Sequence, residues 1–351
     1  MITYKTGDIL KADAEALVNT VNTVGIMGKG IALQFKKVFP DNFKAYQKAC
    51  EQNELKMGKM FVYERNTFTN PRYIINFPTK KHWKSKSKYE DIKSGLSDLL
   101  IVIKKYRIRS IALPPLGCGL GGLNWDTVKQ MIKEVLETIP EIDVLVYEPS
   151  GAPKPEKIKS PSKKPNMTLG RAALLELMEK YRETGYEYRL SILEIQKLMY
   201  FLQVAGEKLK LDFQKYYYGP YADNLRHVLN NIEGHFITGY GDGTVKPETS
   251  IKVLPEIMPE AHRFLQNHAE TKQRIDRVKK LIDGFETPYG MELLSSVHWV
   301  CAKNFNNGEL PVPENVLTKI QQWSKRKEKI FKAEHVTKAL EKLKNQGWLL
   351  R

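Results

Sequence analysis

The sequence predicts an α/β domain followed by a mainly α-helical domain, and three observations support this division. The chain has 351 residues, more than one hydrophobic core usually holds, so roughly two domains are expected. The first 150 residues alternate short apolar runs with amphipathic stretches, whereas the sequence after residue 168 reads mainly as helices. The stretch between them is rich in proline and lysine, as solvated linkers are. We therefore predict domains at 1–150 and 168–351, joined by a linker at 151–167.

The first domain has the strand and helix rhythm of a sheet covered by helices. Its predicted strands lie at 16–22, 59–64, 72–77, 110–116 and 143–149, and its predicted helices at 30–39, 42–53, 91–106 and 125–139. The runs SIALPPL and DVLVYEP are continuously apolar, which is typical of strands buried on both faces. Ligands of such sheets bind at the carboxyl ends of the strands.

The second domain is predicted to be mostly helical. Helices are expected at 172–184, 192–210, 223–232, 291–305 and 335–347, with a short strand or wing at 236–246. Its histidines are dispersed, and no pair has the spacing of a zinc enzyme. Basic helices at 272–280 and 325–332 fit solvated faces or nucleic-acid contacts. We therefore expect this domain to bind a partner rather than to catalyse a reaction.

Composition and charge narrow the class of protein. Hydrophobic residues make up 42% and charged residues 27%, close to the globular average, which excludes a wholly disordered chain. Three scattered cysteines fit a reducing cytosol, and we expect no metal and no cofactor. The chain begins without a signal-peptide pattern and has no long apolar run, so we expect a soluble cytoplasmic protein without a membrane partner. Its net charge of +16 favours polyanionic partners.

Two glycine-rich segments follow predicted strands and precede helices. One runs from Asn19 to Gly30 and the other from Pro114 to Leu123. Glycines expose backbone N–H groups there, and the helix that follows presents its positive end to an anion. Neither segment matches a Walker loop or the dinucleotide fingerprint. Together they predict a cradle for a diphosphate.

Two further residues could hold a purine beside this cradle. Asp8 offers a carboxylate and Tyr147 an aromatic ring, which would hydrogen-bond and stack the base. Asp8 alone fits a turn or cap residue equally well.

Four motifs in order, GDIL, NTVN with GIMGKGIALQF, PPLGCGLGGL and YEP, resemble those of a macrodomain that binds ADP-ribose. The resemblance covers residues 1–150 and implies a three-layer α/β/α fold with a mixed sheet. It places the adenine at the first and last motifs, the distal ribose at the second and the diphosphate at the third. The implied ADP-ribose-binding residues are Asp8, Ile9, Asn19, Asn22, Gly28, Gly30, Ile31, Gly117, Cys118, Gly119, Leu120, Gly121 and Tyr147.

The segment NFPTKKHW, residues 76–83, resembles the DarG antitoxins and their relatives, the terminal ADP-ribose glycohydrolases. In that class the lysine that matches Lys80 is catalytic. An amine near the anomeric carbon, if partly neutral, can attack the opened sugar or help expel the base. The alternative is that Lys80 only contacts phosphate or DNA. The protein-directed relatives have an aspartate where this chain has Gly121, which favours the DarG branch, and Asp126 is expected to cap or solvate the next helix.

A basic and aromatic stretch follows Lys80 directly. Residues 80–89 interleave lysines with Trp83 and Tyr89, a composition that stacks unpaired bases and pairs with phosphates. We predict DNA contacts at Lys81, His82, Trp83 and Lys84. The alternative is a solvated loop. DarG antitoxins remove ADP-ribose from thymidine in DNA, so the resemblance implies ADP-ribosylated single-stranded DNA as the substrate.

Part of the second domain resembles the helical antitoxin domain of several toxin–antitoxin pairs. The likeness rests on LSILEIQKLMYFL, residues 190–202, and on the aromatic-rich YGP turn after Phe213. Tyr216, Tyr217, Tyr218 and Tyr221 fit a core or a contact surface equally well.

Taken together, the sequence predicts a DarG-type antitoxin with two activities. Its macrodomain would be a hydrolase that reverses DNA ADP-ribosylation, a form of DNA repair, and its second domain would bind a DarT-like toxin. Two alternatives stay open: a non-catalytic ADP-ribose reader, or a nucleic-acid-binding regulator whose macrodomain senses nucleotide.

Overall fold

The computed structural model describes residues 1–67, 69–149, 163–182, 190–244, 246–304 and 311–349. The chain divides into two compact units, formed mainly by residues 1–162 and 163–351. Residues 150–162, which make up most of the predicted linker, lie outside the described residues.

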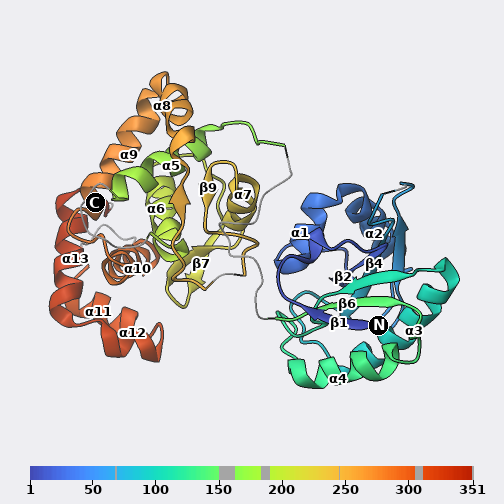
Figure 1. Ribbon diagram of the computed structural model, residues 1–351. Helices are drawn as coiled ribbons and strands as arrows, with labels where there is room; N and C mark the ends of the chain where they lie inside the picture. The colour runs from blue at the N-terminus through green and yellow to red at the C-terminus, as the bar shows by residue number, and fades with distance from the viewer. Residues whose placement is uncertain (68, 150–162, 183–189, 245, 305–310, 350–351) are drawn as a thin grey trace. The chain divides into compact units, whose positions relative to one another are not determined.

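The first unit is a six-stranded mixed sheet between helices (Figure 1). Its strands are β1 (Ile2–Lys5), β2 (Ala16–Asn22), β3 (Phe61–Glu64), β4 (Tyr73–Lys80), β5 (Ser110–Leu113) and β6 (Asp143–Tyr147). Its helices are η1 (Ile9–Lys11), α1 (Gly30–Val38), α2 (Pro40–Glu51), α3 (Tyr89–Tyr106) and α4 (Trp125–Leu136). The strand order is β1-β6-β5-β2-β4-β3, and β3 alone in this order runs antiparallel to its neighbour.

Helices cover both faces of this sheet. In β2, Ala16 and Val18 belong to the core shared with α3 and α4, whereas Leu17 belongs to the core shared with α1. Because alternate residues of a strand point to opposite faces, this division requires helices on each side. The predicted three-layer α/β/α fold is therefore confirmed.

The second unit is mainly helical, as predicted (Figure 1). Its helices are α5 (Leu169–Arg182), α6 (Ile192–Val204), α7 (Leu225–Ile232), η3 (Pro255–Ile257), α8 (Met258–Gln266), α9 (Ala269–Ile282), α10 (Pro288–Asn304), α11 (Pro313–Gln321), α12 (Lys325–Ile330) and α13 (Ala333–Asn345). Two short antiparallel pairs accompany them: β7 (Phe213–Tyr216) with β8 (Gly219–Ala222), and β9 (Ile237–Thr238) with β10 (Lys252–Val253). The β9 strand lies within the wing predicted at 236–246.

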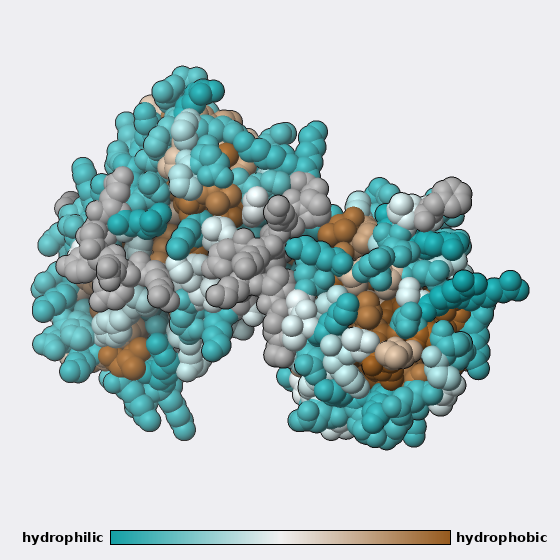
Figure 2. Space-filling model, in the orientation of Figure 1, coloured by the Kyte–Doolittle hydropathy of each residue, from teal (hydrophilic) through white to brown (hydrophobic). Residues whose placement is uncertain are grey.

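Most of the visible surface of each unit is hydrophilic (Figure 2). Among the described helices, none is long and apolar enough to cross a membrane.

The strand predicted at 16–22 is confirmed as β2, but several other predicted boundaries differ from the structure. The strand expected at 72–77 continues to Lys80, because β2 and β4 pair in parallel as far as Asn22 opposite Lys80. The helix expected at 192–210 ends at Val204, since Gly206 has a φ of +103°, a left-handed conformation that a helix cannot continue through.

Candidate active site

The candidate site lies at the carboxyl edge of the macrodomain-like sheet, where the parallel strands β2, β4, β5 and β6 end. Three loops follow these strands: the first glycine loop (residues 23–29), the lysine loop (residues 81–88) and the second glycine loop (residues 114–124). Two hydrogen bonds from Thr23 connect the first glycine loop to the end of β4 and the start of the lysine loop. The Thr23 N–H donates to the Lys80 carbonyl at 3.2 Å, and its hydroxyl donates to the Lys81 carbonyl at 2.7 Å.

Asn22 shapes the first glycine loop from within. Its side-chain oxygen accepts the N–H groups of Val24 at 3.0 Å and Ile26 at 3.3 Å, and its amide donates to the Ile26 carbonyl at 2.5 Å. The fully buried Tyr46 donates its hydroxyl to the Asn22 carbonyl at 2.7 Å. Because its amide is used in this way, Asn22 holds the loop in place rather than pointing into open space.

The start of α1 supplies the other predicted residues of this loop. Gly30 begins the helix with a φ of +61°, which favours glycine, and Gly28 and Ile31 are half-buried beside it. The helix thus presents the positive end of its dipole at the carboxyl edge. This is the arrangement that binds phosphate groups in other proteins.

The second glycine loop has a steric reason for its glycines. Gly117 and Gly122 have φ of +71° and +79°. A Cβ on Gly121 would lie 2.1 Å from the Gly117 carbonyl oxygen and 2.3 Å from Ser87 Oγ. An aspartate, which the protein-directed relatives carry here, therefore cannot fit this loop conformation. The exposed Asp126 does not replace it, because it lies in the first turn of α4, whose N-cap is Asn124.

The remaining residues of this loop differ in exposure. Gly119 is exposed, and a Cβ there would meet no described atom within 4 Å. Leu120 is 55% exposed, so the loop presents an apolar side chain to its surroundings. Burial raises the pKa of the Cys118 thiol to about 11, which keeps it protonated and makes it a poor nucleophile at neutral pH.

Lys80 reaches this loop from the end of β4. Its Nζ donates to the Leu120 carbonyl at 2.5 Å. Partial burial, and secondarily the nearby charge of Lys86, lower the pKa of the Lys80 amine from its ordinary value. A lowered pKa increases the neutral fraction of the amine, which is the form that can act as a nucleophile or base.

Ser87 joins the lysine loop to the second glycine loop. Its N–H donates to the Gly121 carbonyl at 3.1 Å. Its buried Oγ has no hydrogen-bond partner among the described residues, and it lies 3.2 Å from where a Cβ on Gly117 would be. The position of the Lys80 amine therefore depends on contacts between two loops that are far apart in sequence.

Asn19 lies apart from the other predicted ligand contacts. It is fully buried in β2 and donates to the Asn76 side-chain oxygen at 3.0 Å. Asn76 in turn donates to the Asn42 side-chain oxygen at 2.7 Å. This buried amide network ties α2 to β2 and β4 below the site.

The residues predicted to hold adenine gather at the end of β6. Tyr147 is its last residue and is mostly buried, and it pairs in register with Lys5 of β1. Asp8 follows β1 and accepts the Leu10 N–H at 3.1 Å as the N-cap of η1, which leads into the buried Ile9. Burial, and secondarily the charge of Asp8, raise the pKa of Tyr147. Asp8 thus performs the capping role that was its alternative interpretation, next to Tyr147.

The four residues predicted to contact DNA lie on the lysine loop. Trp83 is 38% exposed, Lys81 and Lys84 are exposed, and His82 is half-buried. The His82 and Trp83 rings lie 5.3 Å apart, and Lys84 Nζ lies 4.9 Å from the Trp83 ring centroid. Within the described residues, no carboxylate forms an ion pair with the lysines of residues 80–88. Their positive charge is therefore available to an anion.

Sequence reasoning missed several supporting residues. Tyr46, Asn42 and Ser87 act through contacts between distant segments, and no local motif marks them. Among the described residues, no three His, Cys, Asp or Glu side chains lie close enough to bind a metal ion.

Comparison with known proteins defines the class of the first unit. The family model described as "Macro domain" matches residues 18–132, which include β4, β5 and most of β2 and α4. The first unit is therefore a macrodomain. The solved macrodomain of Mycobacterium tuberculosis DarG shares 54% identity, covers 43% of this chain and 99% of its own, and has a TM-score of 0.42.

Full-length relatives define the family. The chain is 47% identical to a Thermus aquaticus protein named DNA ADP-ribosyl glycohydrolase, over 99% of this chain and 94% of that protein. It is 42% identical to a Mycobacterium tuberculosis protein of the same name, over 98% and 99%. A Thermosipho africanus DNA ADP-ribosyl transferase–DNA ADP-ribosyl glycohydrolase fusion protein is 38% identical over 41% of this chain and 40% of its own. The chain belongs to the DNA ADP-ribosyl glycohydrolases, the DarG family of enzymes. The resemblance and the enzyme class predicted from the sequence are confirmed.

Proposed function

We propose that this protein hydrolyses the bond between ADP-ribose and a thymidine base in single-stranded DNA. The observation that carries the proposal is the 47% identity to a DNA ADP-ribosyl glycohydrolase across 99% of the chain. In this reaction the water oxygen bonds to the anomeric carbon of the ribose, and the bond from that carbon to the base nitrogen breaks. The nitrogen takes a proton, which leaves free ADP-ribose and unmodified thymidine.

Lys80 is the catalytic residue of this proposal. Its amine stands 2.5 Å from the Leu120 carbonyl, at the loop expected to hold the sugar-nucleotide, and its lowered pKa favours a neutral amine. Such an amine can displace the base nitrogen from the anomeric carbon and give a lysine adduct that water then hydrolyses, or it can assist departure of the base. Reduction with borohydride during turnover tests for a ribose adduct on Lys80, and an equal adduct from free ADP-ribose would show that it forms from the product.

The macrodomain edge accommodates the rest of ADP-ribose. We assign the adenine to the end of β6, beside Asp8, Ile9 and Tyr147. We assign the diphosphate to Gly117–Gly121 and the distal ribose to the first glycine loop and the start of α1, including Gly28, Gly30 and Ile31. Asn22 acts by fixing that loop, as its hydrogen bonds to Val24 and Ile26 indicate.

The DNA strand is assigned to the lysine loop. The exposed Trp83 beside Lys84 suits stacking of an unpaired base next to a phosphate. Affinity for the modified strand should therefore fall more steeply with added salt than affinity for free ADP-ribose. Trp83→Ala should weaken strand binding by about 1–3 kcal/mol, the usual value for one stacked base. Equal salt slopes for the two ligands would argue against a DNA site here.

The second unit is proposed to bind and neutralise a DarT-type toxin. A fusion of a DNA ADP-ribosyl transferase with a DNA ADP-ribosyl glycohydrolase exists in Thermosipho africanus, which supports a functional link between the two enzymes. We propose that the protein acts in the cytoplasm as an antitoxin and DNA-repair enzyme. The macrodomain would occupy residues 1–150, the linker 151–167 and the toxin-binding domain 168–351.

The direct test is incubation with a single-stranded oligonucleotide that carries ADP-ribosylated thymidine. We expect release of ADP-ribose and recovery of unmodified DNA. Lys80→Ala should reduce turnover by about 100- to 10,000-fold, the range for loss of a proton-transfer group, while free ADP-ribose binds within a few fold. Lys104→Ala, at an exposed lysine of α3 outside the three loops, is the matched control. Turnover of Lys80→Ala at the parent rate would refute the catalytic assignment.

The alternative of a non-catalytic ADP-ribose reader is not retained, because the relatives that match the whole chain are named as glycohydrolases. The absence of an aspartate at position 121 has a steric explanation and is no argument for a reader. No observation favours the alternative of a nucleic-acid-binding regulator.

A further inference from the structure

The β7–β8 hairpin of the second unit exposes two tyrosines. Tyr216 is 61% exposed and Tyr217 is 51% exposed. Tyr216 stacks on Tyr221 with ring centroids 5.1 Å apart, and Tyr217 packs edge to face on Tyr218 at 4.7 Å. The tip of this tyrosine cluster is therefore exposed and does not belong to the core, which was one of the two expectations from the sequence.

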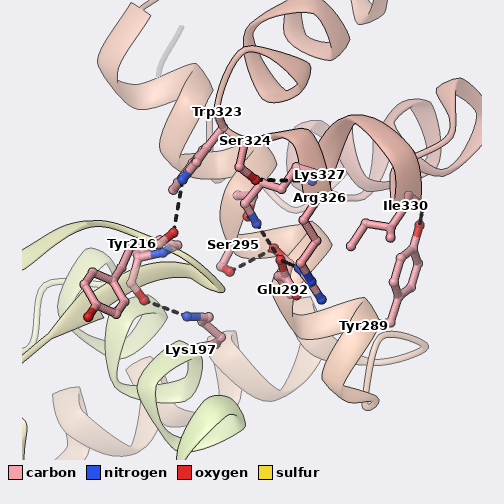
Figure 3. Close-up of polar contacts among 12 residues, drawn as sticks. Lys197, Tyr216, Tyr289, Glu292, Ser295, Trp323, Ser324, Arg326, Lys327 and Ile330 are labelled. Carbon is pink, nitrogen blue, oxygen red and sulfur yellow. Dashed lines mark hydrogen bonds and ion pairs between the residues drawn. The ribbon is translucent and has the colours of Figure 1, made fainter.

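The α6 and α10 helices hold the base of this hairpin. Lys197 Nζ of α6 donates to the Pro220 carbonyl at 2.7 Å and is almost fully buried (Figure 3). Gly219 has a φ of +99°, and a Cβ there would lie 3.1 Å from Ser296 Oγ and 3.3 Å from Ser295 Oγ of α10. The turn therefore lies close against α10, where a side chain at position 219 would have little room.

The α11–α12 segment holds the tip of the hairpin. Trp323 Nε1 donates to the Tyr216 carbonyl at 3.0 Å (Figure 3). The Arg326 guanidinium lies 4.9 Å from the Tyr218 ring centroid and 5.4 Å from that of Tyr217. Both exposed tyrosines are therefore fixed through their backbone or their neighbours.

A buried ion cluster anchors this segment. Glu292 of α10 accepts Arg326 at 2.6 Å and Lys327 at 2.5 Å, and Lys327 also donates to Ser296 at 3.1 Å (Figure 3). The Lys327 side chain is fully buried. Burying such charges is costly and adds rigidity only where the geometry is satisfied. The ion cluster of Glu292, Arg326 and Lys327 fixes α12 next to the two exposed tyrosine rings. Aromatic side chains that are held in place before binding are typical of binding hot spots.

The contacts of the rings favour a protein partner over nucleic acid. One side of Tyr216 is taken by Tyr221, and Arg326 lies over the Tyr217 ring, so each ring face available for base stacking is reduced. Lys327 is fully buried and Arg326 is paired with Glu292, so neither presents an unpaired positive charge to a phosphate. The exposed cations nearby in sequence are Lys215, Lys325 and Lys329. A partner with an apolar centre and acidic residues around it would complement this pattern.

We propose that the tip of the β7–β8 hairpin is the surface through which the second unit binds the DarT-type toxin, by an apolar and acidic patch on that protein. This inference rests on the proposed antitoxin function. It assigns Tyr216 and Tyr217 as the central contacts and α12 as their support.

The test compares binding of a purified DarT-type toxin from the same organism to the full chain and to the Tyr216→Ala/Tyr217→Ala double variant. We expect the double variant to lose affinity by about 30-fold or more, the loss typical of hot-spot residues. Glycohydrolase turnover should stay at the parent value. Tyr4→Ala, which removes a tyrosine that is 36% exposed on the macrodomain, is the matched control and should bind normally.

A milder variant tests whether the α11–α12 segment holds the hairpin in its binding conformation. Trp323→Phe removes the bond to the Tyr216 carbonyl and keeps the ring, so toxin affinity should fall by about 3- to 10-fold, the equivalent of one hydrogen bond. Toxin binding by the double variant within twofold of the parent overturns the inference and leaves the proposed function standing. Failure of the parent chain to bind the toxin overturns both. Loss of binding to an unmodified single-stranded oligonucleotide, with toxin binding retained, assigns the hairpin to nucleic acid and also overturns it.

Discussion

The lysine loop of the macrodomain and the β7–β8 hairpin of the second unit both place exposed aromatic rings beside basic side chains, but they treat the cations differently. Among the described residues no carboxylate pairs with Lys80 or Lys84, whereas Glu292 pairs with both Arg326 and Lys327. Unpaired cations can meet an anionic substrate or take part in chemistry. Cations paired with a buried carboxylate mainly hold structure, so we propose that the same residue types serve the reaction in one unit and rigidity in the other.

The largest of these effects should come from Gly121, which follows Leu120, the residue whose carbonyl accepts the amine of the proposed catalytic Lys80. Gly121→Asp places a Cβ 2.1 Å from the Gly117 carbonyl oxygen, so the second glycine loop must move. Because small displacements of reacting groups are costly, we expect turnover to fall by about 100-fold or more. Gly119→Ala, where a Cβ meets open space, should stay within twofold. Steady-state release of ADP-ribose and its binding by calorimetry would measure both, and an active Gly121→Asp would show that the loop is more adaptable than its geometry indicates.

Substitution of Lys327 should lower the stability of the second unit and leave the glycohydrolase turnover unchanged. Lys327→Ala leaves Glu292 buried with one of its two cations missing, and breaking such a pair costs about 3–5 kcal/mol. We expect the second unit to unfold at lower denaturant concentration while the macrodomain keeps its turnover. Lys80→Ala should show the reverse, with stability nearly unchanged. Denaturation followed by circular dichroism, together with turnover of each variant, checks the contrast. Equal losses of stability in the two variants would remove the distinction between the two regions.

The charge of Lys86 should set the pH range in which Lys80 works. Burial first, and Lys86 second, lower the pKa of the Lys80 amine. If the neutral amine reacts, turnover rises with pH through that pKa. Lys86→Gln removes a positive neighbour and raises the pKa of Lys80, so the rise should move to higher pH and turnover at neutral pH should fall by several fold. Lys88→Gln should leave the profile unmoved, and a profile that is identical in Lys86→Gln would argue that the two amines do not interact.

The smallest effect concerns the buried amine under the hairpin. Burial, and secondarily Lys327, lower the pKa of Lys197 to about 7, while in the unfolded chain it stays near 10.5. Between these values the unfolded state binds more protons, so this lysine makes stability rise as pH increases from about 7 to 10. Lys197→Met should flatten that rise in the unfolding free energy, measured in denaturant at pH 7 and pH 9. A rise of the same size in the variant would place its origin in another group.

The sequence pattern predicted the strands that are mostly buried and missed the strands that are mostly exposed. The strands β2, β5 and β6 are apolar runs buried on both faces, and the sequence identified them. The edge strand β1 and the hairpin strand β7 each have three exposed residues of four, so neither shows a clear apolar pattern. Their existence depends on pairing with β6 and β8, which only the tertiary structure supplies.

The candidate site follows the same division. Lys80 and the glycine loops could be placed together because parallel strands end at one edge of a sheet. The sequence does not show in the same way whether a polar strand residue points toward the ligand or into the core. Asn19, which was expected to contact the ligand, is fully buried in a hydrogen-bond network with Asn76 and Asn42, a position that the sequence does not reveal. Ser87, which joins the two loops, bears no sequence mark because its role comes from its contact with Gly121.

That contact has a consequence for how this site can evolve. A single base change turns many glycine codons into aspartate, so the acid found at this position in protein-directed relatives is genetically close. The Ser87 hydroxyl and the Gly117 carbonyl already occupy the space such a side chain needs. A lineage that gains the acid must therefore first shrink or shift residue 87 or rebuild the turn at 117, and the order of these substitutions decides whether the intermediates stay active.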